Sequence, residues 1–138
     1  MAKKEKNDTM IDGFPMLKKH IIESIKYLAT SGEQQLSLLP DFVCKPYEIA
    51  SSLDDWLLMY NNGIAQKKES LFTESEFKLI SDLNNMFKDF HCSEEYEKSD
   101  WTEDAVKASE KWDEVRTFAK HVLMVLNIEY SMPEKKSI

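Results

Sequence analysis

The side chains of this 138-residue chain that could hold a metal ion are three histidines, two cysteines and many carboxylates. None of His20, His91 and His121 belongs to a zinc-binding arrangement such as His-Glu-x-x-His. His91 and Cys92 are adjacent, but neighbouring residues on a helix point in different directions and rarely share one ion. We therefore expect no metal site.

Nucleophilic catalysis by a cysteine needs a neighbouring base and an activated thiol. Cys44 precedes Lys45 and a predicted helix start, but nothing in the sequence supplies a partner histidine or oxyanion donors. We expect Cys44 and Cys92 to be idle thiols rather than a nucleophile or a disulfide. The three glycines are isolated, which excludes a phosphate-binding glycine loop. The sequence predicts a binding protein without a cofactor, not an enzyme.

Residues 93–104 interleave carboxylates with two aromatic rings and a single lysine. Such a segment suits a basic partner, because carboxylates steer and pair with its cations while Tyr and Trp act as anchors. In the alternative, Trp101 packs into the core beside a helix start, and the acids offset the helix dipole. The two interpretations can hold together. The candidate partner-binding residues of this segment are Glu94, Glu95, Tyr96, Glu97, Asp100, Trp101, Glu103 and Asp104.

The charge of the chain also favours a cationic partner. Its formal net charge is −7, and without residues 1–6 and 134–138 there remain 23 acids against 13 bases. Such a body repels nucleic-acid phosphates and anionic lipid, so we expect neither as a partner; simple solubility is the other reason for the acids. Asp54 and Asp55 lie on a predicted helix. They either form a second contact with the partner or belong to a solvated helix face.

The scarcity of Gly and Pro, three and four residues, predicts helices joined by few loops rather than a sandwich or a barrel. The apolar periodicity predicts a first helix that Pro15 opens and Gly32 ends, with residues 34–39 prolonging it or forming a separate turn. A second helix opens at Pro46 and takes Gly63 as its C-cap.

Two more helices follow. Thr73 and Glu76 form a capping box that opens a third helix, which runs through Phe90. Asp100 and Glu103 predict the start of the last and longest helix, and residues 93–100 before it are a loop. The buried stripe expected on the last helix is Ala105, Ala108, Trp112, Val115, Ala119, Val122 and Leu126.

These elements predict an all-α fold, an antiparallel bundle of four main helices. An extra short helix over residues 64–71 is left open. We expect a single domain over residues 1–138, with residues 1–12 and 131–138 frayed. No stretch approaches the roughly 20 apolar residues of a membrane span, and no secretory signal is recognised, so we expect a cytoplasmic protein.

Two blocks of sequence carry a family resemblance. The first is Leu39-Pro40-Asp41-Phe42, followed by Pro46-x-Glu48-x-Ala50 and acids at 54 and 55; the second is Trp101-Thr102-Glu103-Asp104-Ala105 with Trp112-x-x-Val115-Arg116. Together they resemble small all-helical immunity proteins of bacterial polymorphic toxin systems, including contact-dependent growth inhibition systems. The similarity spans about residues 34–126, and Tyr47 stands where the pattern has a smaller polar residue.

The resemblance implies a cytoplasmic protein that binds the C-terminal toxin domain of its own system and blocks its active site or substrate groove. Many such toxins are nucleases with basic clefts, which agrees with the acidic body of this chain. The resemblance also implies that the motif residues are structural and do not locate the binding face. A general helical adaptor or regulator is the alternative function, and an enzyme or small-ligand binder is a third.

Overall fold

The computed structural model describes residues 16–67 and 71–133, and all regular structure in this part of the chain is helical. Four of its six helices have seven residues or more, as the sequence predicts. The elements are the first helix (residues 16–28), α2 (Gly32–Ser37), α3 (Lys45–Lys67), α4 (Glu74–Asn85), α5 (Glu103–Ala108) and α6 (Glu110–Val125), with 3-10 turns η1 (Met86–Asp89) and η2 (Tyr96–Lys98).

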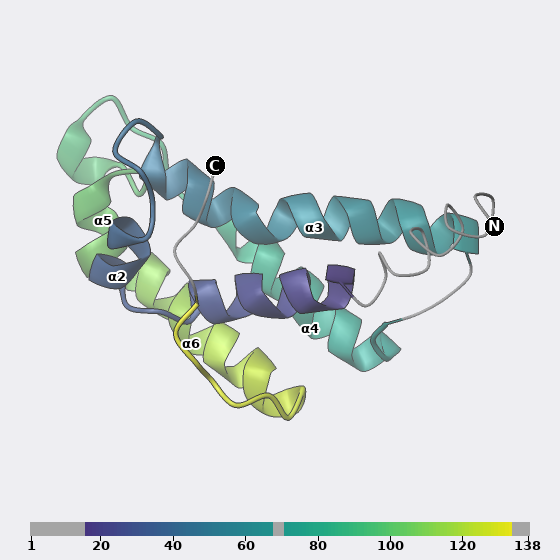
Figure 1. The fold of residues 1–138 in the computed structure, drawn as a ribbon. Coiled ribbons are helices and arrows are strands. Elements are labelled where there is room, and N and C mark those ends of the chain that lie inside the picture. Colours follow the sequence, from purple (N-terminus) through teal and green to yellow (C-terminus); the bar gives the residue numbers. More distant parts are fainter. Residues whose placement is uncertain (1–15, 68–70, 134–138) are drawn as a thin grey trace.

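The longest helix, α3, runs across the molecule, and α2 and α5 lie together at its Lys45 end (Figure 1). The first helix lies along α3, whereas α4 and α6 contact each other and run obliquely to it (Figure 1). The antiparallel four-helix arrangement therefore stays a prediction. Within the described residues, no helix is both long and apolar enough to cross a membrane.

Two predicted helix ends are wrong because both glycines lie inside helices. Gly32 is the first residue of α2, which Ser31 caps by accepting a hydrogen bond from the Gln34 amide, so α2 is a separate element. Gly63 lies within α3, which continues to Lys67. The extra short helix left open over residues 64–71 is not a separate element as far as residue 67, because α3 continues to Lys67. Residues 68–70 lie outside the described chain.

The capping box that opens α4 is confirmed. The Thr73 hydroxyl accepts from the Glu76 amide at 3.1 Å, and the Glu76 carboxylate accepts from the Thr73 amide at 2.8 Å. These bonds satisfy two amides that a helix start leaves without an intrahelical partner. The α-helix ends at Asn85, and η1 carries the chain on towards Phe90.

The last predicted helix is divided in two. Thr102, not Asp100, caps α5, and Ser109 separates α5 from α6 with extended backbone, its hydroxyl accepting from the Lys111 amide. The division rotates α5, so that Val106 is its buried residue while Ala108 is exposed. From Trp112 onward the expected stripe is confirmed as far as Val122. The main core residues of the longer helices are Ile21, Ile25, Leu53, Ile80, Leu83, Trp112 and Val115.

Most of the residues that the sequence predicts to be frayed are not among those that the structure describes. Residues 1–12 and 134–138 lie outside the described chain. Residues 131–133 are described and have no regular structure, and the Ser131 hydroxyl accepts a hydrogen bond from Lys26 at 2.9 Å.

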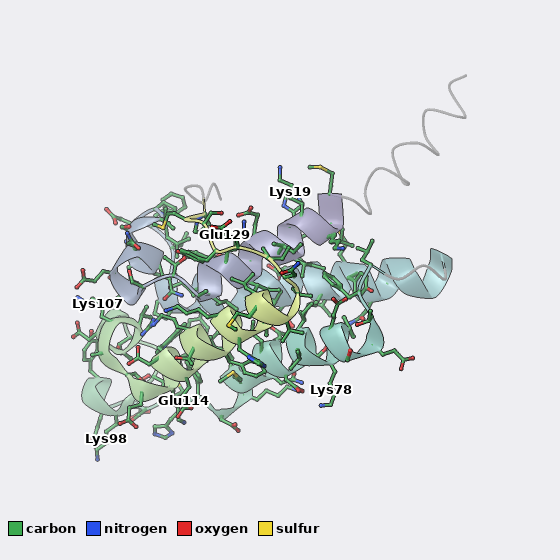
Figure 2. All side chains as sticks on the ribbon, turned by 90° about the horizontal axis from the view of Figure 1, so that it is seen from below. Lys19, Lys78, Lys98, Lys107, Glu114 and Glu129 are labelled. Carbon is green, nitrogen blue, oxygen red and sulfur yellow. The ribbon has the colours of Figure 1, made fainter. Side chains whose placement is uncertain are left out.

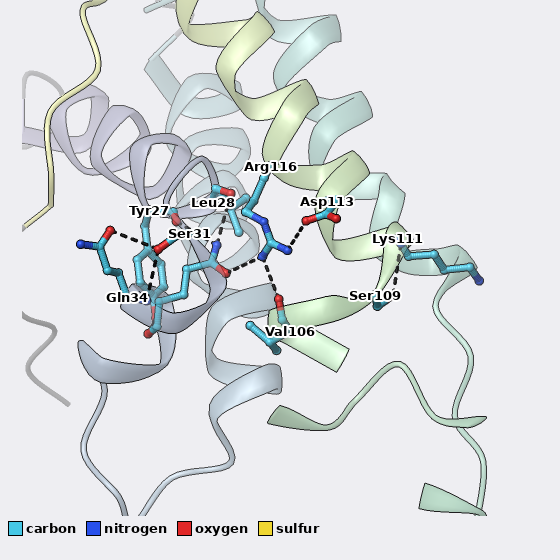
Figure 3. A network of polar contacts seen from close by, with 10 residues as sticks. Tyr27, Leu28, Ser31, Gln34, Val106, Ser109, Lys111, Asp113 and Arg116 are labelled. Atoms are coloured by element: carbon cyan, nitrogen blue, oxygen red, sulfur yellow. Dashed lines mark hydrogen bonds and ion pairs between the residues drawn. The ribbon is translucent and has the colours of Figure 1, made fainter. Parts of the chain in front are cut away.

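A buried polar network joins the first helix to α2, α5 and α6 (Figure 3). The Gln35 amide nitrogen donates to the carbonyls of Tyr27 and Leu28 at 3.0 and 3.2 Å, which caps the end of the first helix. Arg116 donates from Nη1 to Gln35 Oε1 at 3.1 Å and to the Val106 carbonyl at 2.9 Å. Among the described residues, no buried side-chain nitrogen or oxygen lacks a partner. The network fixes the corner on which the candidate site is built.

Gly32 allows α2 to approach α5 at this corner. A Cβ on Gly32 would lie 2.4 Å from the Val106 carbonyl oxygen and 2.9 Å from Lys107 Cα, both backbone atoms. We expect Gly32→Ala to lower the free energy of unfolding by about 1–3 kcal/mol, the usual cost of overpacking. Urea denaturation followed by circular dichroism measures it. The matched control is Glu33→Ala, at the exposed next position of α2, which should change the free energy of unfolding by less than about 0.5 kcal/mol.

Candidate functional site

A groove of about 620 Å³ lies where the segment after η1 folds back over the start of α3 and meets α5. We call it the acidic groove. Its lining includes Cys44, Tyr47, Glu94, Trp101, Glu103 and Asp104. The structure thus brings Glu94, Tyr96, Trp101, Glu103 and Asp104, five of the residues predicted to bind a partner, to one surface.

Stacked aromatic rings form one wall of the acidic groove. The rings of Tyr47 and Trp101 lie 4.6 Å apart and are parallel to within 4°. Behind them, Trp101 packs against Phe90 at 5.3 Å and against Trp112 at 6.2 Å. Trp101 is therefore both a half-buried staple beside the α5 start and part of the groove wall. The packing of Trp101 beside the core agrees with one interpretation drawn from the sequence, and its role as a partner anchor stays a prediction.

Asp100 has a structural position. Its carboxylate accepts from the His91 amide at 2.6 Å and lies 3.5 Å from Lys111 Nζ, and its own amide donates to the His91 carbonyl at 2.8 Å. The Asp100 carbonyl accepts from Trp112 Nε1 at 2.8 Å. These contacts close the segment between residues 91 and 100 into a loop and hold it on α6. Asp100 shapes the groove rather than lining it.

The rim of the groove carries the accessible carboxylates. Glu94 and Glu103 are exposed, and no ion pair with another described residue occupies them. Asp104 accepts from the Tyr96 hydroxyl at 3.2 Å and lies 3.9 Å from Lys107 Nζ. Tyr96 is 58% exposed. A ring held at its hydroxyl end and open to solvent suits an anchor for a partner.

Of the other residues predicted to bind a partner, Glu95 and Asp55 do not line the groove, and the Glu97 side chain is not described. Glu95 pairs with Lys98 at 3.1 Å on η2, and Lys98 projects at the edge of the molecule (Figure 2). The Glu97 side chain lies outside the described residues. Asp55 is exposed on α3.

Asp54 lies in a smaller hollow of about 390 Å³ between α3 and the end of α4. Its carboxylate accepts a hydrogen bond from the side-chain nitrogen Nδ2 of Asn84 at 2.9 Å, so it tethers the two helices. Tyr47 lines both this hollow and the acidic groove. Asp54 is therefore adjacent to the groove through Tyr47, although it is far from residues 94–104 in the sequence.

Tyr47 is an aromatic groove residue that the partner-binding prediction missed. Its position directly after Pro46 and its departure from the family pattern were the available signals. Partial desolvation, together with the Cys92 and Cys44 thiols that share the groove, raises the pKa of the Tyr47 hydroxyl. A tyrosine hydroxyl is protonated at neutral pH with its ordinary pKa of about 10, so this rise leaves its state unchanged. Tyr47 can donate a hydrogen bond to an acceptor in the groove.

The two cysteines are exposed free thiols that line the same groove from different loops. Within the described residues, no three His, Cys, Asp or Glu side chains converge into an arrangement that could hold a metal ion. What the site offers is a concave aromatic surface lined by three carboxylates and by two lysines, Lys45 and Lys107. Such a surface binds by shape, charge and desolvation of anchors.

Comparisons with protein-family models, curated proteins and solved structures find no match for this chain. The resemblance to immunity proteins therefore stays a prediction that rests on the two sequence blocks. Several block residues have structural contacts here: Thr102 caps α5, Trp112 is buried, and Arg116 joins α6 to α2 and α5.

Proposed function

We propose that this protein is a cytoplasmic immunity protein that binds and neutralises a basic bacterial toxin domain through the acidic groove. The observation that carries the proposal is the joining of exposed carboxylates and an exposed tyrosine on one concave, aromatic-walled surface. It acts by occupying the toxin's active site or substrate groove and catalyses no reaction itself.

The physical basis is a division of roles around the groove. Glu94 and Glu103 offer carboxylates that pair with no other described residue, and these attract Lys and Arg of a nucleic-acid-binding cleft and speed encounter. Tyr96 and Tyr47 offer apolar area with a polar tip, which suits desolvated contacts at the centre of an interface. A nuclease cleft shaped for phosphates presents the complementary charge.

A general helical adaptor is the alternative, since the same groove would serve any basic protein. The two functions differ in genetic context and in effect on cells. The test is to express the toxin domain encoded by the neighbouring reading frame with and without this protein. We expect co-purification and protection from toxicity. Binding without protection would favour the adaptor, and failure to bind would reject the immunity proposal.

Tyr96→Ala should raise the dissociation rate from the toxin domain by about tenfold, as loss of a central anchor does, with little change in the association rate. Surface plasmon resonance separates the two rates. Leu58→Ala removes another exposed apolar side chain, on α3, and serves as the matched control. If both variants dissociate like the parent, Tyr96 is not an anchor.

A further inference from the structure

The solvent face of α6 carries a second hollow, distinct from the acidic groove. It has a volume of about 780 Å³ and is formed along α6 with Met86 of η1 at its edge. Its α6 lining is Glu110, Asp113, Glu114, Thr117, Phe118 and His121. These positions follow three- and four-residue steps, so they form one continuous helix face opposite the buried stripe.

This α6 face is divided into an acidic half and an apolar half. Glu110, Asp113 and Glu114 occupy the beginning of the helix, and Glu114 projects at the surface (Figure 2). Helical spacing continues the face beyond His121 to Met124 and Val125, which are 76% and 46% exposed. Few other large apolar side chains in the described chain are as exposed as Met124. Contiguous exposed apolar area of this kind marks interaction surfaces.

The acids of this face are available to a partner. Glu110 and Glu114 are exposed and form no ion pair with another described residue. The Asp113 carboxylate lies 2.6 Å from Arg116, yet its side chain is still 65% exposed. Favourable interaction with the helix dipole explains acids in the first turn. It does not explain an exposed methionine and valine three turns later on the same face.

A second copy of the chain is a poor occupant of this face. Parallel pairing of two α6 helices would place the carboxylates of one against those of the other. Antiparallel pairing would place the carboxylates against Met124 and Val125 and leave them desolvated without cations. Both arrangements are unfavourable, because like charges repel and buried charges without partners are costly.

We propose that the α6 face docks an amphipathic helix of a partner protein, with apolar side chains on Phe118, Met124 and Val125 and Lys or Arg opposite Glu110 and Glu114. Apolar contacts give such helix-in-groove binding its affinity, and the cations fix its direction. This surface is separate from the acidic groove, and the proposal does not depend on the toxin-neutralising function.

The test uses the full-length ¹⁵N-labelled protein and a synthetic peptide of about the length of α6, 16 residues, with leucines on one half of a helical face and lysines on the other. We expect amide shifts centred on α6 and η1 that saturate with peptide. The affinity should fall about tenfold for Met124→Ser and for the pair Glu110→Gln and Glu114→Gln, and far more weakly for the controls Leu58→Ser and Glu33→Gln. A peptide with glutamates in place of lysines should not saturate the face.

Three results would overturn the proposal. The first is the absence of α6 shifts, or α6 shifts that all variants and both peptides produce equally. The second is a dimer in sedimentation that Met124→Ser dissolves, which would make a second copy the occupant. The third is a change in the same α6 amides when residues 1–12 are deleted without any peptide, which would make this lysine-bearing segment of the chain the occupant.

Discussion

Replacement of Trp112 by alanine should lower the free energy of unfolding by about 3–5 kcal/mol, the usual cost of emptying a buried aromatic site. Trp112 is 0% exposed and packs against Phe90 at 5.0 Å and Phe87 at 5.4 Å. Its indole nitrogen also holds the Asp100 carbonyl, so the variant loosens the acidic segment as well as the core.

Chemical denaturation followed by far-ultraviolet circular dichroism measures this loss. Trp112→Phe keeps most of the ring and loses the hydrogen bond, so it should cost clearly less than Trp112→Ala. Phe42→Ala, at a highly exposed position, is the control and should change stability by less than about 0.5 kcal/mol. An unchanged denaturation midpoint in Trp112→Ala would show that Trp112 is not part of the core.

Replacement of Arg116 by methionine should lower the free energy of unfolding by about 2–4 kcal/mol, because two buried acceptors lose their hydrogen-bond donor. The acceptors are Gln35 Oε1 and the Val106 carbonyl, which lies in the last turn of α5. Loss of the Asp113 contact adds little, since that carboxylate is mostly exposed. The expected result is a lower denaturation midpoint with the helical content of the folded state retained.

A double-mutant cycle separates these contributions. Asp113→Asn should cost less than about 1 kcal/mol, as exposed ion pairs do. Gln35→Met combined with Arg116→Met removes one donor and its acceptor together, and it should cost less than the sum of the two single changes. Strict additivity would mean that Gln35 and Arg116 do not act as a unit.

The helices and much of the core could be predicted from the sequence because both depend on local signals. The 3.6-residue apolar period identified the first helix, α3, α4 and α6, and the capping box at Thr73 fixed the start of α4. The burial of Trp112 followed from its place in the α6 stripe. Such features need no knowledge of what packs against them.

The errors arose where tertiary contacts decided the local structure. A glycine at position 32 is typical of a helix end. In the structure, however, Gly32 allows α2 to approach the backbone of Val106 closely, and this contact exists only in the folded chain. The apolar period runs through Ser109 without interruption, so the division between α5 and α6 left no signal in the pattern. Gly63 costs α3 some stability without ending it.

The candidate site was predictable in composition but not in geometry. The acidic segment was visible as a run of carboxylates around Tyr96 and Trp101. Nothing in the run distinguished Asp100, which is bound to His91 and Lys111, from Glu103, which faces the groove. Tyr47 lies on α3, far from Trp101 in the sequence. The stacking of the two rings that forms one wall of the groove is therefore visible only in the fold.

The central claim, that the acidic groove binds a basic toxin domain, is tested most directly by the association rate with that domain as salt is varied. The variant to compare carries Glu94→Gln, Glu103→Gln and Asp104→Asn and leaves the structural Asp100 intact. The matched control removes as many charges elsewhere, through Glu33→Gln, Glu74→Gln and Glu129→Gln, all at exposed positions.

We predict that the groove variant associates about tenfold more slowly than the control at low salt. The difference should shrink as salt is raised, because exposed charges are screened beyond roughly 10 Å at about 0.1 M ionic strength. Equal association rates for the groove variant and the control at every salt concentration would contradict the claim.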